Sequence, residues 1–574
     1  ARYGGRISSV LEINSRDGNS KKITGSAGIG LLTGKFHLEG PIIKNKTNFI
    51  IGARTTYSDW ILGMLPESSG YKNGTAAFHD ITAGISHKID SKNTLYLNAY
   101  YSKDGFKFNT DTSFYYQNLN ASLKWRSLIN EHHNLVISAG YDHYNYKTSD
   151  VGNAVNAYSM NFAIKQIFLK ANFNWLINEK HSLNYGLNSV FYQLNPGSLL
   201  PIGEESLVIP KILSVERATE SALYLSDNWS ISDKLSLDLG LRYSYYTALG
   251  EKTYYKYFAG EPRSELSIID TVTVGAGKFV KPYHGPEFRI SARYAFNNDF
   301  SFKIGFNSMR QNIHMLSNTT AISPTDTWKL SDANIVPQSG WQTAFGLYGN
   351  TLGQRIELSL EGYYKEMYNY LDYKSGAILN MNEYIERDVV ETNGKAYGIE
   401  FMVKKPLGKL NGWMAYTYSK TMLQQTVKDQ GALINKGDWY PASYDKPHDL
   451  KIIANYKFTQ RFSVSLNVDY STGRQVTIPL SKYYYGNVYR LFYSDRNAYR
   501  IPDYFRMDFA INIEPSHNLK LLTHSTITLG VYNLTGRKNA YSIYYDTNSG
   551  TKIQGYKLSI FGAPIPYITY NIKF

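Results

Sequence analysis

Apolar and polar residues alternate along the last strand-like segment of the chain. The apolar positions of this segment are Ile568, Tyr570, Ile572 and Phe574. The polar positions between them are Thr569, Asn571 and Lys573. A period of two residues predicts a β-strand with one apolar and one polar face. Such a strand fits either the edge of a soluble β-sandwich or the closing strand of a membrane β-barrel, which faces lipid on one side and water on the other.

This alternation recurs through most of the chain. It is clear from Leu235 to Leu241, from Phe288 to Tyr294, from Phe300 to Phe306 and from Phe462 to Tyr470. Short clusters rich in Asn, Asp, Gly, Pro or Ser separate successive strands and have the composition of reversing turns. The predicted tight turns lie near Lys44–Lys46, Asp90–Asn93, Asn130–Asn134, Asn178–His181, Ser232–Lys234, Asn297–Asp299, Gly349–Gly353, Pro406–Gly408, Thr459–Arg461 and Pro515–Asn518.

These turns predict the number of strands. About ten tight turns join about twenty strands, and one more strand at each end brings the total to about 22. A soluble β-sandwich seldom needs so long an unbroken series of hairpins. The pattern therefore predicts an all-β fold, a 22-stranded antiparallel transmembrane β-barrel. We expect the strand that ends at Phe574 to pair with the segment from Ile23 to Leu32, which closes the barrel.

Longer connections alternate with the tight turns and are therefore expected at the opposite rim of the barrel. The largest predicted connections run from about Asn195 to Arg217, Gly250 to Gly285, Arg310 to Gln338, Gln424 to Pro447 and Ser471 to Pro502. They are rich in Tyr, Ser, Asn and Gly, the residues of adaptable binding loops. No segment has the character of a separate soluble domain.

Composition narrows the class of protein. The 574 residues contain no apolar run of about 18 residues, which excludes transmembrane helices. The 51 tyrosines fit the aromatic girdles of a membrane barrel. Because cysteine is absent, disulfides, zinc–thiolate sites and thiol nucleophiles are excluded. The net charge of +14 is dispersed along the chain, which favours an anionic lipid surface or a weakly anionic ligand over nucleic acid.

The N-terminal residues have their own pattern. Ala1–Arg6 show no charged region followed by an apolar core, so we expect no signal peptide within this sequence. For an outer-membrane protein we expect a mature or N-terminally shortened sequence. The stretch from Arg6 to Ile13 is predicted to form a short strand inside the barrel. The polar stretch from Asn14 to Lys22 is predicted to lead from it to the first barrel strand.

Several short strings, taken in their order and spacing, resemble a known family. They are Ala1–Leu11 (ARYGGRISSVL), Leu38–Ile42 (LEGPI), Gly394–Glu400 (GKAYGIE), Asp445–His448 (DKPH), Val531–Leu534 (VYNL) and the terminal Phe574. Each string is short and unspecific alone, but together they cover essentially the whole chain. By these strings the chain resembles the C-terminal part of a TonB-dependent outer-membrane receptor or transporter of the Bacteroidota type.

The resemblance implies an architecture and a function. The wide lumen of such a barrel is closed by a plug domain. The first string resembles the end of that plug, so we expect residues 1–20 to be a plug tail with its linker and residues 21–574 to be the barrel. In this family the full plug follows the segment that engages TonB. Because only the plug tail is expected in this sequence, the motif for energy coupling cannot be carried over to it.

No catalytic or metal-binding set is evident. His132 and His133 fall in a predicted tight turn, without Asp or Glu at ligand spacing. His79 and Asp80 are neighbours on a predicted strand, so their side chains face opposite sides and cannot pair directly. No nucleophile elbow, phosphate loop or dinucleotide motif lies in a convincing context. We therefore predict no enzymatic activity, no cofactor and no metal site.

Aromatic clusters in the long connections are the candidate ligand-binding residues. Aromatic faces with nearby Lys and Arg suit saccharides, peptides or flat siderophore chelates. The candidate residues are Tyr254, Tyr255, Tyr257, Arg310, Gln311, His314, Trp439, Tyr440, Tyr483, Tyr484 and Tyr485. The alternative is that these aromatics pack loop against loop or form the outer girdle. Trp328 is expected to wedge its own loop in place.

Two functions are compatible with these features. The first is uptake of a scarce nutrient (a siderophore, saccharide or peptide) across the outer membrane of a Gram-negative bacterium with energy from TonB. The second is a structural or scaffolding barrel within a multi-protein outer-membrane complex that docks surface lipoproteins. The expected partners are outer-membrane lipid and lipopolysaccharide, the TonB complex through an N-terminal segment absent from this sequence, and, for scaffolding, a surface lipoprotein or another outer-membrane protein. Nucleic acid is not an expected partner.

Overall fold

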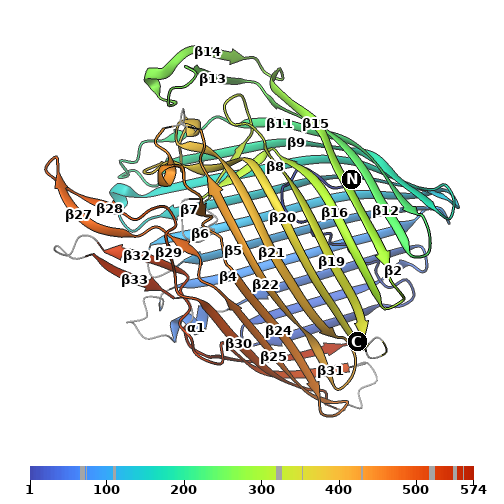
Figure 1. The fold of residues 1–574 in the computed structure, drawn as a ribbon. Coiled ribbons are helices and arrows are strands. Elements are labelled where there is room, and N and C mark those ends of the chain that lie inside the picture. The colour runs from blue at the N-terminus through green and yellow to red at the C-terminus, as the bar shows by residue number, and fades with distance from the viewer. Residues whose placement is uncertain are drawn as a thin grey trace.

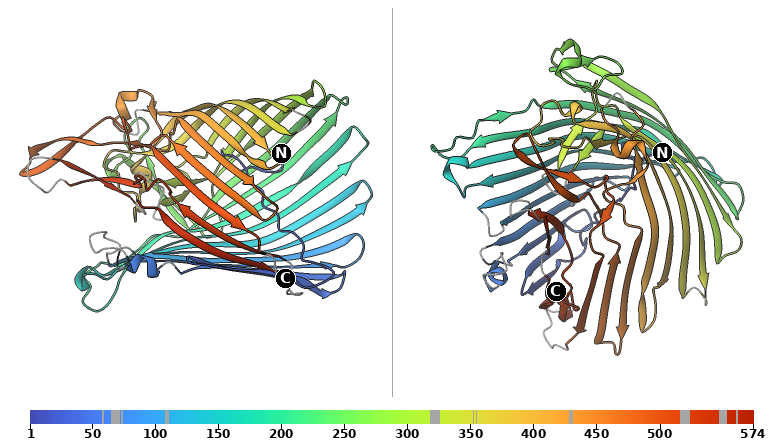
Figure 2. Two further views of the ribbon diagram at one scale, coloured as in Figure 1. Left: turned by 90° about the horizontal axis from the view of Figure 1, so that it is seen from below. Right: turned by 60° about the vertical axis from the view of Figure 1, so that its left-hand side comes forward.

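The protein is a closed antiparallel β-barrel. The computed structural model describes residues 1–57, 59–64, 72, 74–107, 111–317, 326–351, 353, 355–427, 431–515, 524–546, 553–559 and 562–574. Within these residues the largest sheet has 24 strands, of which β10 and β23 contain only two residues each. The other 22 form the barrel wall. Long connections gather at one end of this wall and tight turns at the other (Figures 1 and 2).

Each wall strand pairs with its neighbours in chain order. The wall strands are β1 (Thr24–Gly30), β2 (Thr33–Ile43), β3 (Thr47–Thr56), β4 (Thr75–Lys88), β5 (Asn93–Lys107), β6 (Thr112–Asn130), β7 (His133–Asp150), β8 (Tyr158–Leu176), β9 (His181–Pro201), β11 (Glu216–Ser230), β12 (Leu235–Leu249), β15 (Phe279–Ala295), β16 (Phe300–Gln311), β19 (Gln338–Thr351), β20 (Ile356–Tyr373), β21 (Val389–Lys405), β22 (Leu410–Gln424), β24 (His448–Lys457), β25 (Phe462–Ser471), β30 (Tyr504–Ile513), β31 (His524–Tyr532) and β34 (Ile565–Lys573).

The first and last strands close the barrel. β1 pairs with β34 in an antiparallel register in which Ala27 faces Ile572 and Ile29 faces Tyr570. The seam extends to the last residue, because Gly25 N donates to Phe574 O at 2.9 Å and Phe574 N donates to Gly25 O at 3.0 Å. The predicted pairing of the two chain ends is therefore confirmed.

The alternating residues divide between lipid and lumen as predicted. Phe288 and Ile290 on β15 and Ile304 on β16 expose 46%, 48% and 48% of their surface on the outer face. The seam strand exposes Ile568 and Tyr570 in the same way. In a membrane these outward side chains meet hydrocarbon, while the polar residues between them face the wet lumen.

The tight turns lie at one rim, as predicted. The turn predicted at Gly349–Gly353 is shorter than expected. Strand β19 continues through Gly349 to Thr351, and Leu352 lies outside the described residues. In the last turn, residues 516–523 also lie outside the described residues. At the other rim two strands run further than expected, since β9 continues past Asn195 and β15 begins at Phe279, ahead of Gly285.

Short strands and helical turns lie at the long-loop end of the barrel. The small strands are β10 (Lys211–Ile212), β13 (Lys252–Tyr257), β14 (Ile268–Val274), β17 (Ile313–Leu316), β18 (Thr327–Leu330), β23 (Tyr440–Pro441), β26 (Gln475–Val476), β27 (Pro479–Tyr485), β28 (Val488–Tyr493), β29 (Tyr499–Arg500), β32 (Ser542–Asp546) and β33 (Gln554–Leu558). The helical turns are α1 (Asp59–Gly63), η2 (Ala154–Asn156), η3 (Glu265–Ser267), η4 (Ile385–Arg387) and η6 (Ile434–Gly437). No helix among the described residues is long and apolar enough to cross a membrane.

The buried apolar residues gather at the long-loop end. Strands β6 to β9 contain 18 to 21 residues, about twice the 9–11 residues that cross a bilayer. Their extra length forms a tall wall beside the mouth of the barrel. The hairpin β17–β18 folds inward and packs Ile313, Trp328 and Leu330 against inward residues of this wall, including Leu194, and against Tyr246 of β12. Trp328 therefore wedges its loop in place, as predicted.

Two further clusters fill the mouth from the opposite side. One joins Leu316 and Ile335 of the β16–β19 connection to Leu379 and Ile385 of the β20–β21 connection. The other joins Ile434, Tyr440 and Ala442 of the β22–β24 connection to the ends of β21 and β22. Three connections are thus held inside the mouth by apolar packing, and the spaces between them form the cavities described below.

The N-terminal segment lies inside the barrel but does not form the predicted strand. Residues from Arg6 to Ile13 have no regular secondary structure. Every wall strand already pairs on both sides, so the closed wall offers no free edge to a further strand. The prediction of a strand over this stretch is therefore wrong, and Val10, Leu11 and Ile13 remain exposed to the lumen by 56%, 84% and 83%.

Side chains of the wall hold this segment instead. Asn188 of β9 donates to Arg2 O at 2.9 Å, and Ile7 N donates to Gln311 Oε1 of β16 at 3.2 Å. Further along, Ser15 Oγ donates to Asn98 Oδ1 of β5 at 3.1 Å. The segment therefore crosses the lumen from one side of the wall to the other before β1 begins.

A substitution on the outer face tests the assignment of lipid and lumen sides. Ile399, near the middle of β21, is 54% exposed on the outer face. Ile399→Arg is expected to lower the free energy of unfolding by about 2–4 kcal/mol, because it places a charge in hydrocarbon. Urea titration in phospholipid bilayers measures this change. Thr417→Arg, on the lumen face between the outward Tyr416 and Tyr418 of β22, is the matched control and should change little. Equal losses in both variants would contradict the assignment.

Candidate functional site

The mouth of the barrel contains a cavity of about 720 Å³, which we call the mouth cavity. The ends of β20, β22, β25 and β30 and the connections beside them form its walls. Tyrosines dominate its described lining: Tyr370, Tyr373, Tyr444, Tyr504 and Tyr541. Rings of this kind combine a broad apolar face with a polar hydroxyl, so they suit ligands that stack and accept or donate a hydrogen bond.

A β-bulge directs the end of β20 into this cavity. The register of β20 against β21 shifts between Met367 and Tyr370. Within the bulge, Asn369 has a φ of 55°, a left-handed conformation that Asn adopts more readily than most residues. Bulges of this kind bend a strand and redirect its side chains. Tyr370, Asp372 and the residues beside them consequently line the cavity.

Two ion pairs brace the floor of the mouth cavity. Arg496 Nη1 donates to Asp372 Oδ1 at 3.2 Å, and the guanidinium also stacks over the ring of Tyr373 with its carbon 4.3 Å from the ring centre. Arg500 Nη2 donates to Asp445 Oδ2 at 2.6 Å. The carboxylates of both pairs are at least nine-tenths buried. Each carboxylate therefore neutralises its arginine partner. Together the two ion pairs hold the backbone of the β25–β30 connection in place.

A second cavity continues from the first along the inner wall. It has a volume of about 860 Å³ and is lined by inward residues of β5 to β8 and by Arg6 of the N-terminal segment. Met315 and Tyr541 line both cavities. The two spaces therefore meet at this pair of side chains, and the mouth cavity communicates with the lumen.

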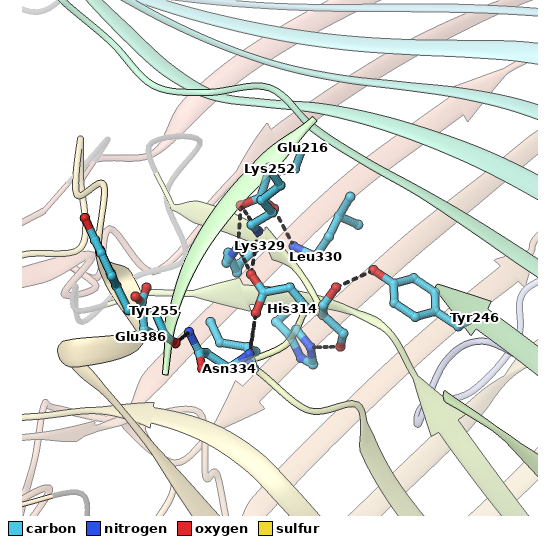
Figure 3. A network of polar contacts seen from close by, with 12 residues as sticks. Glu216, Tyr246, Lys252, Tyr255, His314, Lys329, Leu330, Asn334 and Glu386 are labelled. Atoms are coloured by element: carbon cyan, nitrogen blue, oxygen red, sulfur yellow. Dashed lines mark hydrogen bonds and ion pairs between the residues drawn. The ribbon is translucent and has the colours of Figure 1, made fainter. Parts of the chain in front are cut away.

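A buried ion network anchors the hairpin β17–β18 beside these cavities (Figure 3). Lys329 Nζ lies 2.8 Å from Asp332 Oδ2 and also pairs with Glu216 at the start of β11. Lys252 of β13 lies 2.6 Å from the same Asp332 oxygen. Burial alone would raise the pKa of Asp332, but Lys252 and Lys329 together hold it well below its usual value. The network thus joins three separate connections through ion pairs.

His314 is the uncharged member of this region (Figure 3). Its Nε2 lies 2.8 Å from Ser331 Oγ, its Nδ1 has no partner among the described atoms, and the residue is 0% exposed. Burial, and then the charge of Lys329, lower the pKa of His314 to about 3. The side chain is therefore neutral at physiological pH and packs as part of the anchor. His314, predicted from the sequence as a candidate ligand-binding residue, is not part of the lining of the mouth cavity.

The other predicted ligand residues fall into separate groups. Tyr254, Tyr255 and Tyr257 lie on β13, where Tyr257 Oη donates to Glu386 Oε1 at 2.9 Å. Arg387 lies over the ring of Tyr255. This group packs one connection against another, and Tyr254 and Tyr255 border a third cavity of about 610 Å³ that also contains the ion network.

Residues near the base of the mouth have structural partners. Gln311 binds Ile7 of the N-terminal segment, as described above, and Arg310 is the half-buried residue before it on β16. Trp439 is 37% exposed, with Lys395 Nζ 4.0 Å from its ring centre. Tyr440 is 1% exposed and donates its hydroxyl to Asp372, so it supports the cavity floor from behind.

Tyr483, Tyr484 and Tyr485 lie apart from the mouth. They belong to the hairpin β27–β28, which projects beyond the rim of the barrel (Figures 1 and 2). Their exposed fractions are 48%, 62% and 68%. The two tyrosine clusters of β13 and β27 therefore do not converge in the structure.

Sequence reasoning missed several residues of the mouth cavity. Tyr444, Tyr541 and Arg474 line it, yet each comes from a different connection and none belongs to a spaced motif. One feature of the sequence could have indicated that Tyr370 and Tyr373 line the cavity. They lie at an aromatic strand end that continues beyond the length of a membrane span. Among the described residues, no group of three or more His, Asp or Glu side chains is arranged to hold a metal ion.

Comparison with known proteins identifies the family. A family model described as TonB dependent receptor-like, beta-barrel, matches residues 45–534. The chain belongs to this family of receptors. The resemblance inferred from the sequence is confirmed at this level, and receptors of this family work with TonB in the outer membrane. No curated protein matches the chain.

Solved structures support the fold of this receptor. The ferric-catecholate import receptor Fiu from E. coli has 13% identity and a TM-score of 0.65, over 98% of this chain and 83% of that chain. The ferripyoverdine receptor of Pseudomonas aeruginosa has 12% identity and a TM-score of 0.63, over 98% and 72%. The ferric yersiniabactin uptake receptor FyuA from Yersinia pestis has 11% identity and a TM-score of 0.64, over 97% and 80%. At such identities the likeness establishes the shared fold alone.

The buried histidine predicts a pH-dependent anchor. Below pH about 6.5 the opened hairpin β17–β18 takes up a proton on His314 that the closed form excludes until the pH approaches 3. Opening should therefore rise by up to about tenfold per pH unit as the pH falls through this window. Hydrogen exchange of β17–β18 amides, corrected for the intrinsic exchange rate, measures it. His314→Gln should flatten the dependence; an unchanged slope in this variant would contradict the role of His314.

The ion network predicts a large local effect of one lysine. Lys329→Met leaves Glu216 and Asp332 with Lys252 alone, and breaking a buried pair costs about 3–5 kcal/mol. Amide protection in β17–β18 should fall by about a hundredfold or more. The matched control is Lys256→Met, which removes an exposed pair with Asp270 at 2.9 Å on the neighbouring hairpin. In Lys256→Met the amide protection of β17–β18 should change little, because an exposed ion pair contributes little to stability. Similar effects of both variants would refute the anchor.

Proposed function

We propose that this protein is an outer-membrane receptor that takes up a scarce nutrient with energy derived from TonB. The observation that carries the proposal is the mouth cavity: a tyrosine-lined space that communicates with the lumen at Met315 and Tyr541. Its volume of about 720 Å³ lies within the range of small-molecule sites, which is about 300–1,000 Å³. A ligand held there stands at the entrance of the path through the barrel.

The proposal extends to the organisation of the chain. We assign residues 1–20 as the tail of a plug domain with its linker and residues 21–574 as the barrel. The contacts of Arg2, Ile7 and Ser15 with the inner wall support this assignment, because a plug occupies the lumen. The TonB-engaging segment then precedes this tail in the full protein. The outer membrane of a Gram-negative bacterium, with its lipopolysaccharide, is the proposed location, and the Bacteroidota type rests on the sequence strings.

The candidate nutrients are siderophores, saccharides and peptides. The solved relatives described above are named as receptors for ferric chelates, and another relative, with 9% identity and a TM-score of 0.63 over 98% of this chain and 82% of that chain, is named as the copper transporter OprC. These names favour a metal chelate. The tyrosine lining suits all three classes, because planar chelates, sugar rings and aromatic peptides all stack on aromatic faces.

The projecting hairpin favours a second candidate function, a scaffold that docks a surface lipoprotein or another outer-membrane protein. In β27–β28 both faces carry apolar side chains in solvent: Tyr483 and Phe492 on one face, Tyr484 and Tyr489 on the other. An isolated two-stranded hairpin has little stability of its own. Tyrosines that cluster beyond the rim are typical of protein interfaces. The same receptor can combine both functions, with the cavity for a nutrient and the hairpin for a partner.

Growth and pull-down experiments separate the two functions. A deletion strain should grow poorly on one limiting source among iron chelates, oligosaccharides and peptides. The wild-type gene should restore growth, and a proton-motive-force uncoupler should abolish uptake of that source. Pull-down from detergent-solubilised membranes tests the scaffold. A stoichiometric surface lipoprotein retained without added nutrient, with no growth defect on any source, would contradict transport.

Single aromatic substitutions distinguish the cavity from the hairpin. Tyr444→Ala removes a ring from the mouth cavity and should weaken binding of the nutrient found in the growth screen by about fivefold to tenfold, because a stacked ring contributes roughly 1 kcal/mol. Tyr484→Ala removes the same group from the hairpin and should leave this affinity unchanged. Isothermal titration of the purified receptor measures both. Equal weakening by the two variants would place the ligand elsewhere.

A further inference from the structure

The charges of the mouth cavity do not balance. Its described lining contains the cations Lys446, Arg474 and Arg496 and the single acid Asp372. Asp372 is already paired with Arg496, and Asp445, the neighbour of Lys446, is paired with Arg500. Neither carboxylate is therefore free to neutralise Lys446 or Arg474, and the cavity carries an excess of positive charge.

Arg474 is the central group of this excess. Its side chain is half-buried, and within the described part of the chain its guanidinium makes one hydrogen bond, from Nη2 to the carbonyl oxygen of Tyr541 at 3.0 Å. A guanidinium has five N–H donors in a planar fork. No carboxylate among the described residues forms an ion pair with it. A charged group that is partly removed from water without a counter-ion is costly, and the carboxylate of a ligand would supply that counter-ion.

The backbone holds Arg474 rigidly at the cavity wall. The chain at Gly473 passes so close to the neighbouring segment that a Cβ there would lie 1.7 Å from the carbonyl oxygen of Ile501. Gly473 N also donates to Asp503 Oδ1 at 2.9 Å. On the other side of Arg474, β26 pairs with β29. The guanidinium is therefore presented by a fixed backbone, which lowers the entropy lost when it binds.

Lys446 and the tyrosines complete the arrangement. The side chain of Lys446 is exposed and has no hydrogen bond or ion pair to the described residues. Tyr444 and Tyr541 expose 43% of their surface each, so their rings are available beside the two cations. An arginine fork recognises a carboxylate through two parallel hydrogen bonds, while lysine adds a point charge. Aromatic faces next to such a pair hold the organic body of the ligand.

We propose that the mouth cavity selects a small organic ligand that carries a carboxylate, bound by Arg474 and supported by Lys446, with its body against Tyr444 and Tyr541. This inference rests on the proposed function and names the chemical feature of its nutrient. A carboxylate occurs on iron chelates, on acidic saccharides and on the C-terminus of peptides. Neutral sugars and neutral chelates lack it and therefore lose the main charged contact.

Matched pairs of probes test this proposal on the purified full-length receptor. The pairs are a carboxylate-bearing ferric chelate and its methyl ester, tetragalacturonic acid and its methyl ester, and an aromatic tetrapeptide and its C-terminal amide. Isothermal titration should show at least one acid that binds tenfold or more tightly than its neutral partner, and the pair that does so identifies the source of the carboxylate. Raising the salt concentration should reduce this preference.

Variants assign the preference to Arg474. Arg474→Gln should weaken binding of that acid by roughly tenfold to a hundredfold, since a hydrogen bond to a charged group is stronger than a neutral one, and leave the neutral partner unchanged. Arg474→Lys keeps the charge but loses the planar fork, so it should retain only part of the preference. Arg490→Gln, on the projecting hairpin, makes the same charge change outside the cavity and should have no effect. Heat-modifiable migration in electrophoresis confirms that each variant forms the barrel.

The outcomes separate this inference from the proposed function. If the growth screen identifies a nutrient whose uptake is unchanged in Arg474→Gln, or if acids and their neutral partners bind equally, the carboxylate is not recognised and the inference is overturned, while uptake stands. If no source shows a growth defect and no probe binds, both fail. A preference that Arg490→Gln removes as fully as Arg474→Gln also overturns the inference, because general surface charge then explains it.

Discussion

The structure depends on the closure of the backbone hydrogen-bond ladder at the seam between β1 and β34. Hydrocarbon offers no hydrogen bonds, so a sheet can cross a membrane only if it has no free edge. Here the seam runs from Gly30 to the terminal Phe574, whose amide and carbonyl both bind Gly25. Closure at the chain ends fixes the circumference of the wall. The width of the lumen follows from it, and with it the need to fill the mouth with connections and the interior with a further segment.

The connections in the mouth are held by different interactions from the strands of the wall. The wall strands are satisfied by their neighbours, but the connections above them must bury apolar residues against whatever side chains the tall strands β6 to β9 present. Ile313 and Leu330 meet that wall, and a charged network around Lys329 and Asp332 fixes the same hairpin in register. Apolar packing thus stabilises the hairpin against the wall, and the ion pairs determine its position there. The mouth cavity is the space that remains between connections held in this way.

The wall was predictable from the sequence and the site was not, for a physical reason. Lipid on one side and water on the other impose a local alternation, so each strand can be recognised from its own residues, as from Leu235 to Leu241. The mouth cavity instead joins residues from four connections, and no spacing along the chain relates Tyr444 to Arg474 or Tyr541. Local composition also misleads: the run at Tyr483 and the run at Tyr254 are alike in sequence, yet one projects into solvent and the other packs against η4. His314 is polar, but a single hydroxyl partner allows it to be buried.

The failure of the N-terminal segment to form a strand has a mechanical consequence. A strand in a ladder resists shear because many parallel hydrogen bonds must break together. The segment around Ile7 and Ser15 is attached by separate side chains on different strands. A pulling force on one end of the segment would break these contacts one after another. Little force is then required to withdraw the segment, and the wall, whose ladder is untouched, keeps its shape.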